Sequence, residues 1–131
     1  MNKKILISAA VLGVLSVVLG AFAAHSLKEL ISVESLRTFE TGVRYQMYHA
    51  ILLLFVGNTK YITAKSKKSI FYLVLFGVMF FSFSIYCLAA NSLTSFDFKK
   101  IGFITPIGGL LLIIAWIILL INFLKLKTDN S

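Results

Sequence analysis

The chain has few charged residues compared with soluble proteins. Of its 131 residues, 14% are charged and 59% are hydrophobic, whereas an average soluble domain is about 25% charged and roughly 45–50% apolar. The mean hydropathy is +0.93. This composition is incompatible with a soluble enzyme, a disordered tail or a zinc module, because each of these needs more polar or metal-binding side chains.

Cysteine and proline are nearly absent. Cys87 is the single cysteine and lies in an apolar run, so an intramolecular disulfide is excluded and we interpret the residue as a small packing side chain. Pro106 is the only proline, and no Pro-, Gly- or Ser-rich linker interrupts the chain. We therefore expect one integral membrane domain over residues 1–131.

Long apolar runs are what the sequence has instead. A hydrocarbon core about 30 Å thick needs roughly 20 apolar helical residues, and backbone groups in lipid must be paired within their own segment, which favours helices. The expected fold class is an all-α membrane protein, a four-transmembrane-helix bundle with spans over about residues 5–24, 44–58, 69–90 and 103–124. A helical pattern already begins near Val33, which predicts an interfacial extension of the second helix.

This extension has the pattern of an amphipathic helix at the membrane surface. Ser32 is a candidate N-cap, and Glu34 falls in the first turn, where the helix dipole favours negative charge. Apolar residues recur at helical spacing along one side: Leu36, Phe39, Val43 and Met47. Arg37, Glu40 and Arg44 have the spacing of side-chain ion pairs on a solvated face.

The first span also has the pattern of a secretory signal. Lys3 and Lys4 precede the apolar run, and Ala21–Ala23 ends it with the small residues of a cleavage site. The run is longer than the core of a usual signal, and three further spans follow it. We therefore expect the span to be retained, and a mature N-terminus near Ala24 would contradict this expectation.

Basic side chains are unequally distributed between the two sides of the expected bundle. The side with both termini and segment 59–68 carries eight of the 13: Lys3, Lys4, Lys60, Lys65, Lys67, Lys68, Lys125 and Lys127. The other side carries Lys28, Arg37, Arg44, Lys99 and Lys100. Since this bias sets orientation, we predict a plasma (inner) membrane protein with both termini in the cytoplasm. We interpret the basic residues as topology signals, and no nucleic acid is expected as a partner.

Small residues at helical spacing indicate where the helices meet. Lipid tails are as apolar as leucine, so helix association in a bilayer depends on close backbone approach and on buried polar pairs. The candidate packing positions are Gly13, Gly20, Gly42, Gly77 and Gly109. We interpret these glycines as packing positions rather than as sites of ligand approach.

Polar side chains gather in the half of the expected bundle that faces outward, whereas the inward halves are almost wholly apolar. This candidate polar site consists of His25, Arg44, Tyr45, Gln46, Tyr48, His49, Ser82, Ser84, Tyr86 and Thr105. Gly42, Gln46 and His49 fall at i, i+4 and i+7, which predicts one shared face directed into the bundle. Ionisable residues in spans are costly and often functional. His49, however, lies only about one turn, roughly 7 Å, below Arg44, and polar partners that fix helix register also explain it.

Other functional classes lack the residues that they require. His25 and His49, with no carboxylate in any span, make a weak metal or haem site, so no metal and no cofactor are predicted. Small proton-coupled exporters depend on a carboxylate in the first span, and here no span holds one. The nucleophile elbow, paired carboxylates and phosphate-binding loop of common enzymes are also missing.

Four blocks of sequence resemble the bacterial family called domain of unknown function 423. They cover residues 20–25, 39–50, 81–86 and 105–109, followed by Trp116. The second block, with Tyr45, Gln46, Tyr48 and His49, is the most specific. Eukaryotic relatives of the family look like transmembrane protein 256. The resemblance implies a small multi-pass membrane protein of four helices, supports retention of the first span, and implies no established activity, cofactor or catalytic residue.

Two positions depart from the pattern of that family. Ala23 stands where a glycine is usual, which is a mild change. Phe83 stands where a glycine is usual between two serines, and its larger side chain argues against close helix approach at that point.

The leading functional prediction is a non-enzymatic membrane protein whose outward half forms a small polar pocket or a partner-binding surface. Besides the lipid bilayer, the expected partner is a second copy of the chain or another membrane protein. One alternative is the binding or transport of a lipid-like or small polar ligand, and a membrane enzyme is the third. A dry, tightly packed polar set would count against a carrier.

Overall fold

The computed structural model describes residues 1–127, all of whose regular secondary structure is helical. Its α-helices are α1 (Asn2–His25), α2 (Val33–Asn58), α3 (Ala64–Val78), α4 (Ser84–Ala89) and α5 (Ile104–Leu124). A π-helical turn joins α3 to α4, and 3₁₀ turns lie in the connections: η2 (Met79–Phe83), η1 (Leu27–Glu29), η3 (Asn91–Leu93) and η4 (Phe98–Ile101). The predicted domain, residues 1–131, includes four terminal residues outside this range.

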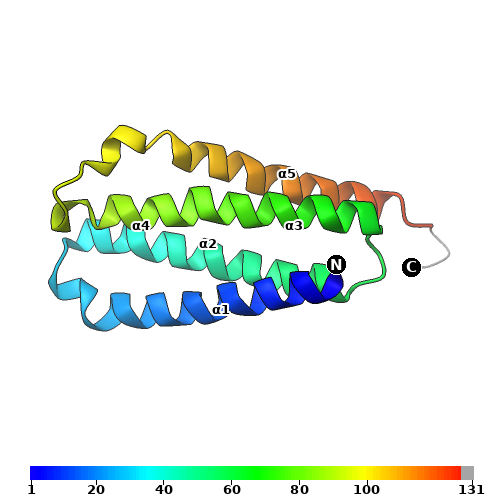
Figure 1. The fold of residues 1–131 in the computed structure, drawn as a ribbon, viewed down its shortest axis with the longest axis horizontal. Helices are drawn as coiled ribbons and strands as arrows, with labels where there is room; N and C mark the ends of the chain where they lie inside the picture. The colour runs from blue at the N-terminus through cyan, green and yellow to red at the C-terminus, as the bar shows by residue number, and fades with distance from the viewer. Residues whose placement is uncertain (128–131) are drawn as a thin grey trace.

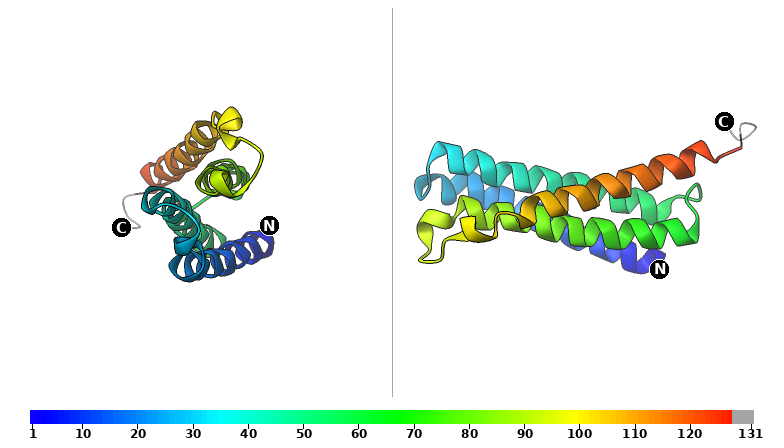
Figure 2. Two further views of the ribbon diagram at one scale, coloured as in Figure 1. Left: turned by 90° about the vertical axis from the view of Figure 1, so that its left-hand side faces the viewer. Right: turned by 90° about the horizontal axis from the view of Figure 1, so that it is seen from above.

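The helices lie side by side with their long axes roughly aligned (Figure 1). α1 packs mainly on α2, and α5 packs mainly on α3 and η2. Seen along the bundle, α1 and α5 lie on opposite sides with α2 and α3 between them (Figure 2). α2 is therefore placed to contact every other long helix.

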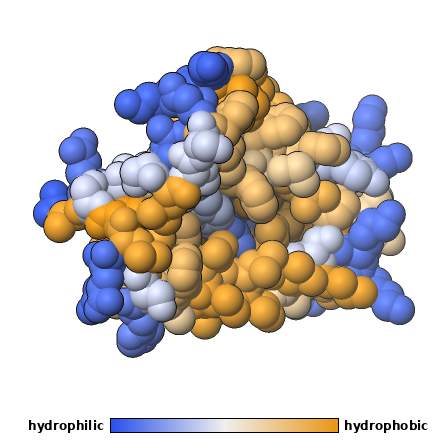
Figure 3. All heavy atoms as spheres, turned by 60° about the vertical axis from the view of Figure 1, so that its left-hand side comes forward, coloured by the Kyte–Doolittle hydropathy of each residue, from blue (hydrophilic) through white to orange (hydrophobic). Residues whose placement is uncertain are grey.

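Three helical segments are long and apolar enough to cross a membrane: Asn2–Glu29, Ala64–Ala89 and Phe98–Leu124. The prediction of apolar helical spans is confirmed for these three. α2 is not among them, since charged and polar residues occupy much of its first half. On the face drawn in Figure 3, apolar residues cover the middle and hydrophilic residues gather toward the ends.

α2 begins where the sequence predicts. Ser32 Oγ accepts a hydrogen bond from the Ser35 backbone N–H at 3.1 Å, so the predicted N-cap is confirmed. The helix then continues without interruption to Asn58 and lies along α1 (Figure 1). Arg44 donates to Thr41 Oγ1 at 3.0 Å rather than to Glu40, the partner that its spacing suggested.

Two buried apolar clusters lie at different levels of the bundle. The larger is built from α1, α2, α3 and α5 and includes Leu53, Val56 and Val74. The smaller joins Phe39 of α2 to Tyr86 of α4 and to the end of α1. On α2, the buried polar residues Gln46 and His49 lie between Phe39 of the smaller cluster and Leu52 of the larger one.

Glycine is required where α5 crosses η2. A Cβ at Gly108 would overlap the backbone of Phe80 and Phe81, and it would lie 2.8 Å from the Gly77 carbonyl oxygen. The backbone of η2 approaches α5 so closely at this level that only a residue without a side chain fits beside it. Gly108 was not among the predicted packing positions.

The predicted packing glycines differ in how closely they are approached. Cβ atoms at Gly42 and Gly77 would lie 2.7 Å from the Tyr86 ring and 2.6 Å from Leu112. Gly20 and Gly109 are in ordinary contact at 3.6 Å, whereas Gly13 has no atom within 4 Å of an added Cβ. Gly13 borders a shallow apolar groove between α1 and α2, so it is not a point of close helix approach.

Candidate functional site

Gln46 connects three helices. Its Nε2 donates to the Leu12 carbonyl oxygen of α1 at 2.9 Å, and its Oε1 accepts from the Tyr86 hydroxyl of α4 at 2.7 Å. Gln46 is 4% exposed and Tyr86 is 9% exposed. Because one end of the amide donates and the other accepts, these two contacts determine its orientation.

A second buried contact joins α2 to η2. Ser82 Oγ donates to the Gly42 carbonyl oxygen at 2.8 Å, and Ser82 is buried. The Tyr86 ring fills the space that a side chain at Gly42 would take. The glycine thus allows both the ring and the serine hydroxyl to approach α2.

His49 is the second buried polar residue of α2. The Trp116 indole N–H of α5 donates to His49 Nε2 at 3.1 Å, and His49 Nδ1 lies 2.6 Å from the Tyr45 carbonyl oxygen. An indole N–H only donates, so Nε2 is the acceptor and Nδ1 carries the proton. Both ring nitrogens are thereby paired in a neutral imidazole.

Ser84 and Thr105 form a separate pair between α4 and the first turn of α5. Their hydroxyl oxygens are 2.5 Å apart, and Ser84 Oγ also lies 2.6 Å from the Phe80 carbonyl oxygen. A serine has one hydroxyl proton. If Ser84 gives it to the carbonyl of Phe80, Thr105 is the donor in the short contact.

The remaining predicted site residues are exposed. Tyr45 is 40% exposed and Tyr48 is 52% exposed, and Arg44 lies beside them. His25 is exposed at the end of α1. The predicted site therefore divides into a buried part and an exposed part, and the prediction that Gly42, Gln46 and His49 share a buried face of α2 is confirmed.

The buried polar contacts lie near the middle of the helices. Gln46 is about 20 Å from the start of a helix roughly 39 Å long, by the helical rise of 1.5 Å per residue. Its partner Leu12 and the His49 partner Trp116 also lie near the midpoints of α1 and α5. His49 lies about 24 Å from the start of α2 by the same helical rise.

Sequence reasoning missed the partners of these side chains. The indole N–H of Trp116 inside an apolar helix needs an acceptor, and His49 supplies one. The Leu12 carbonyl carries no signal in the sequence, because every residue has one. Ser16 of α1 is 1% exposed, and its Oγ has no hydrogen-bond partner among the described residues.

The chemistry available to this set is that of neutral donors and acceptors. Within residues 1–127, no group of three or more His, Cys, Asp or Glu side chains is placed to hold a metal ion. The side chain of His25 makes no hydrogen bond in that range, whereas the ring nitrogens of His49 are paired with Trp116 and Tyr45. The arrangement is suited to holding helices together.

Comparison with known proteins gives a consistent family. The family described as "Protein of unknown function (DUF423)" matches residues 19–109. A "UPF0382 membrane protein" of Staphylococcus saprophyticus is 37% identical over 124 residues, which cover 95% of this chain and 99% of the relative. The "UPF0382 inner membrane protein YgdD" of Escherichia coli is 36% identical over 128 residues, covering 96% and 93%. No solved structure matches the chain.

Proposed function

We propose a function for this chain on the premise that it belongs to the DUF423 family, whose relatives are named membrane proteins. The chain is a non-enzymatic protein of the plasma membrane that binds another membrane protein through one side of α2. That side, here called the exposed α2 strip, consists of the exposed residues Arg44, Tyr45 and Tyr48 together with the half-buried Thr41. Its members fall at i, i+3, i+4 and i+7, which is one helix face.

The proposed topology is a single domain of four spans with both termini in the cytoplasm. α2 supplies the fourth span, its charged first half lies at the interface, and the lysine-rich end of the bundle faces inward. Reporter fusions at the C-terminus test the orientation. Activity there of a reporter that works only outside the cytoplasm would contradict it.

The buried side of α2 has a structural role in this proposal. Gln46, His49 and Ser82 are each paired within the bundle, so their main donors and acceptors are already used. A carrier site between His25, His49, Ser84 and Thr105 would need free polar groups to meet a ligand, but His49, Ser84 and Thr105 are hydrogen-bonded within the bundle. Their pairing supports helix positioning instead.

The exposed α2 strip carries the partner proposal. Tyr45, Tyr48 and Arg44 lie about 17–23 Å along α2, beside apolar segments long enough to cross a membrane. Polar groups that face hydrocarbon are costly, and in membrane proteins they meet other helices or water. The Tyr45 ring is tilted against the Phe81 ring, with 5.0 Å between the ring centres, and Tyr45 and Tyr48 stay exposed.

Site-specific photo-crosslinking tests the proposal. A photoreactive phenylalanine derivative replaces Tyr48 in one variant and Tyr72 in a control, because Tyr72 is also an exposed tyrosine, 38% exposed on α3. We expect a discrete protein adduct in irradiated membranes from position 48 and none from position 72. A product of twice the 14.6 kDa chain mass identifies a second copy, and a different mass identifies another protein. Lipid adducts alone at both positions would overturn the proposal.

A further inference from the structure

Lys67 is a buried lysine whose ammonium has a single hydrogen-bond partner among the described residues. It lies in the first turn of α3 and is 8% exposed. Among residues 1–127, its ammonium donates one hydrogen bond, to Asn2 Oδ1 at 3.2 Å, and an ammonium has three N–H donors. A buried charge is costly unless it is paired, so two unused donors and a full positive charge call for an anion.

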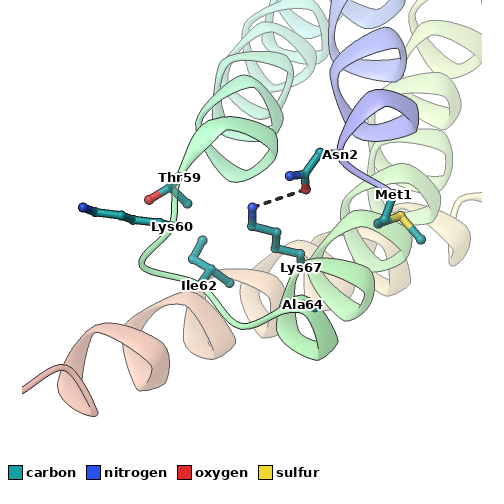
Figure 4. A pocket seen from close by; sticks show the side chains of 7 residues that line it. All are labelled: Met1, Asn2, Thr59, Lys60, Ile62, Ala64 and Lys67. Carbon is teal, nitrogen blue, oxygen red and sulfur yellow. Dashed lines mark hydrogen bonds between the residues drawn. The ribbon is translucent and has the colours of Figure 1, made fainter.

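The ammonium lies at a pocket with a volume of about 230 Å³. Three segments meet there, namely the start of α1, the connection from α2 to α3, and the first turn of α3. The lining residues are Met1, Asn2, Thr59, Lys60, Ile62, Ala64 and Lys67. Figure 4 shows Lys67 reaching across the pocket to Asn2, while Lys60 extends away from it.

Further donors are available on this lining. Asn2 accepts from Lys67 through Oδ1, which leaves its Nδ2 group to donate. Thr59 Oγ1 accepts from the Tyr61 backbone N–H at 3.2 Å, which leaves its hydroxyl proton to donate. The N-terminus of α3 adds the positive end of its dipole beside Ala64.

The surroundings of the pocket are also cationic. Within residues 1–127, eight lysines lie at this end of the bundle, among them Lys65 and Lys68 on α3. The carboxylates Glu29 and Asp97 lie in the connections at the opposite end (Figure 1). Basic pockets between membrane helices on the cytoplasmic side bind phosphate-containing headgroups.

We propose that the Lys67 pocket binds a phosphate group, carried by an anionic lipid headgroup or by a free phosphate ion. Lys67 supplies the charge and two N–H donors, and Asn2 and Thr59 supply neutral donors. The pocket lies at the end of the spans, where headgroups are found, and Ile62 and Met1 give it an apolar rim. This site is separate from the exposed α2 strip, and neither proposal depends on the other.

Thermal unfolding of the delipidated full chain in detergent tests the site. Trp116 is the single tryptophan and reports unfolding by fluorescence. The probes are short-chain phosphatidylglycerol, short-chain phosphatidylcholine, sodium phosphate, and sodium chloride at matched ionic strength. A ligand that binds only the folded state raises Tm, so we expect Tm to rise by several degrees with phosphatidylglycerol, with phosphate, or with both. The probe that acts at the lower concentration identifies the source.

Matched variants separate a built site from diffuse charge. Lys67→Gln should weaken the response at least about tenfold, because a charged hydrogen-bond partner is lost. Lys65→Gln removes the same charge from an exposed neighbour and should leave the response unchanged. Equal losses in both variants would overturn the proposal. Two other results would overturn it. In the first, phosphate and chloride raise Tm equally and neither lipid has an effect. In the second, the two lipids raise Tm equally and phosphate has no effect.

A second variant keeps the test valid if Lys67→Gln fails to fold. Asn2→Asp places a carboxylate where the amide now accepts from Lys67, so it supplies the missing anion from within the chain. We expect this variant to have a higher Tm without added ligand and to respond weakly to phosphate or phosphatidylglycerol. An unchanged ligand response in Asn2→Asp would contradict the site.

Discussion

Tyr86 and Gln46 are 40 positions apart in the sequence and joined by a buried hydrogen bond of 2.7 Å between hydroxyl and amide oxygen. The same amide reaches the Leu12 carbonyl, so one side chain connects α1, α2 and α4. In an apolar environment such contacts specify how neighbouring helices are rotated and aligned, which apolar packing alone does weakly.

Removing the Tyr86 hydroxyl is expected to destabilise the fold. Tyr86→Phe leaves Gln46 Oε1 buried without its donor, so the free energy of unfolding should fall by about 1–2 kcal/mol. Tyr72→Phe is the control, because Tyr72 is partly exposed and makes no hydrogen bond within residues 1–127. Unfolding titrations in mixed micelles measure both. Equal stabilities for the two variants would show that the contact contributes nothing.

The two histidines should behave differently. His49→Ala removes the acceptor of the Trp116 indole N–H and opens a small cavity, so we expect a loss of about 1–3 kcal/mol and a changed Trp116 emission spectrum. His25→Ala, at an exposed helix end, should change stability by less than about 0.5 kcal/mol. Spectra that change alike in both variants would argue against the pairing of His49 with Trp116.

Adjacent glycines on α5 offer a matched test of helix packing. Gly108→Ala forces a methyl group into the backbone of η2 and should cost about 1–3 kcal/mol or more. Gly109→Ala meets only ordinary contact with the Phe81 ring and should be close to neutral. Thermal unfolding of the two variants measures the difference. A neutral Gly108→Ala would mean that α5 lies farther from η2 than the structure shows.

Removing the Ser16 hydroxyl is expected to stabilise the protein. The Ser16 Oγ is buried without a partner in the described range, so Ser16→Ala should raise the free energy of unfolding by up to about 1 kcal/mol. Ser82→Ala should lower it, because the Gly42 carbonyl loses its donor. A lower stability for Ser16→Ala would indicate a partner for this hydroxyl that the chain itself does not supply.

Helical periodicity predicted the faces of α2 but not what each face meets. Spacing placed Gly42, Gln46 and His49 on one side, and Ser32 marked the first turn, because both signals are local. The partners are not local. Leu12 and Trp116 lie on other helices, and their positions depend on how each helix is rotated about its own axis, which a nearly uniform apolar sequence leaves undetermined.

The departures from regular helix geometry were also beyond the sequence. Nothing in Met79–Phe83 distinguishes a π-helical turn from an ordinary one, and only the approach of Gly108 makes its consequence visible. Lys67 looks like its neighbours Lys65 and Lys68 in sequence. It is buried because its position in the first turn of α3 points it toward the start of α1, which is a tertiary relationship.

One side of α2 holds the bundle together, and we propose that the other side binds a partner. The most direct test compares two variants, Gln46→Ala and Tyr48→Ala, extracted from native membranes into mild detergent. For each variant, the Tm and the amount of associated partner are measured on the same preparation. We expect Gln46→Ala to lower Tm, and we expect Tyr48→Ala to keep the Tm of the unchanged protein but to lose the protein associated with it. A lowered Tm with intact association in Tyr48→Ala would contradict this division of roles between the two sides of α2.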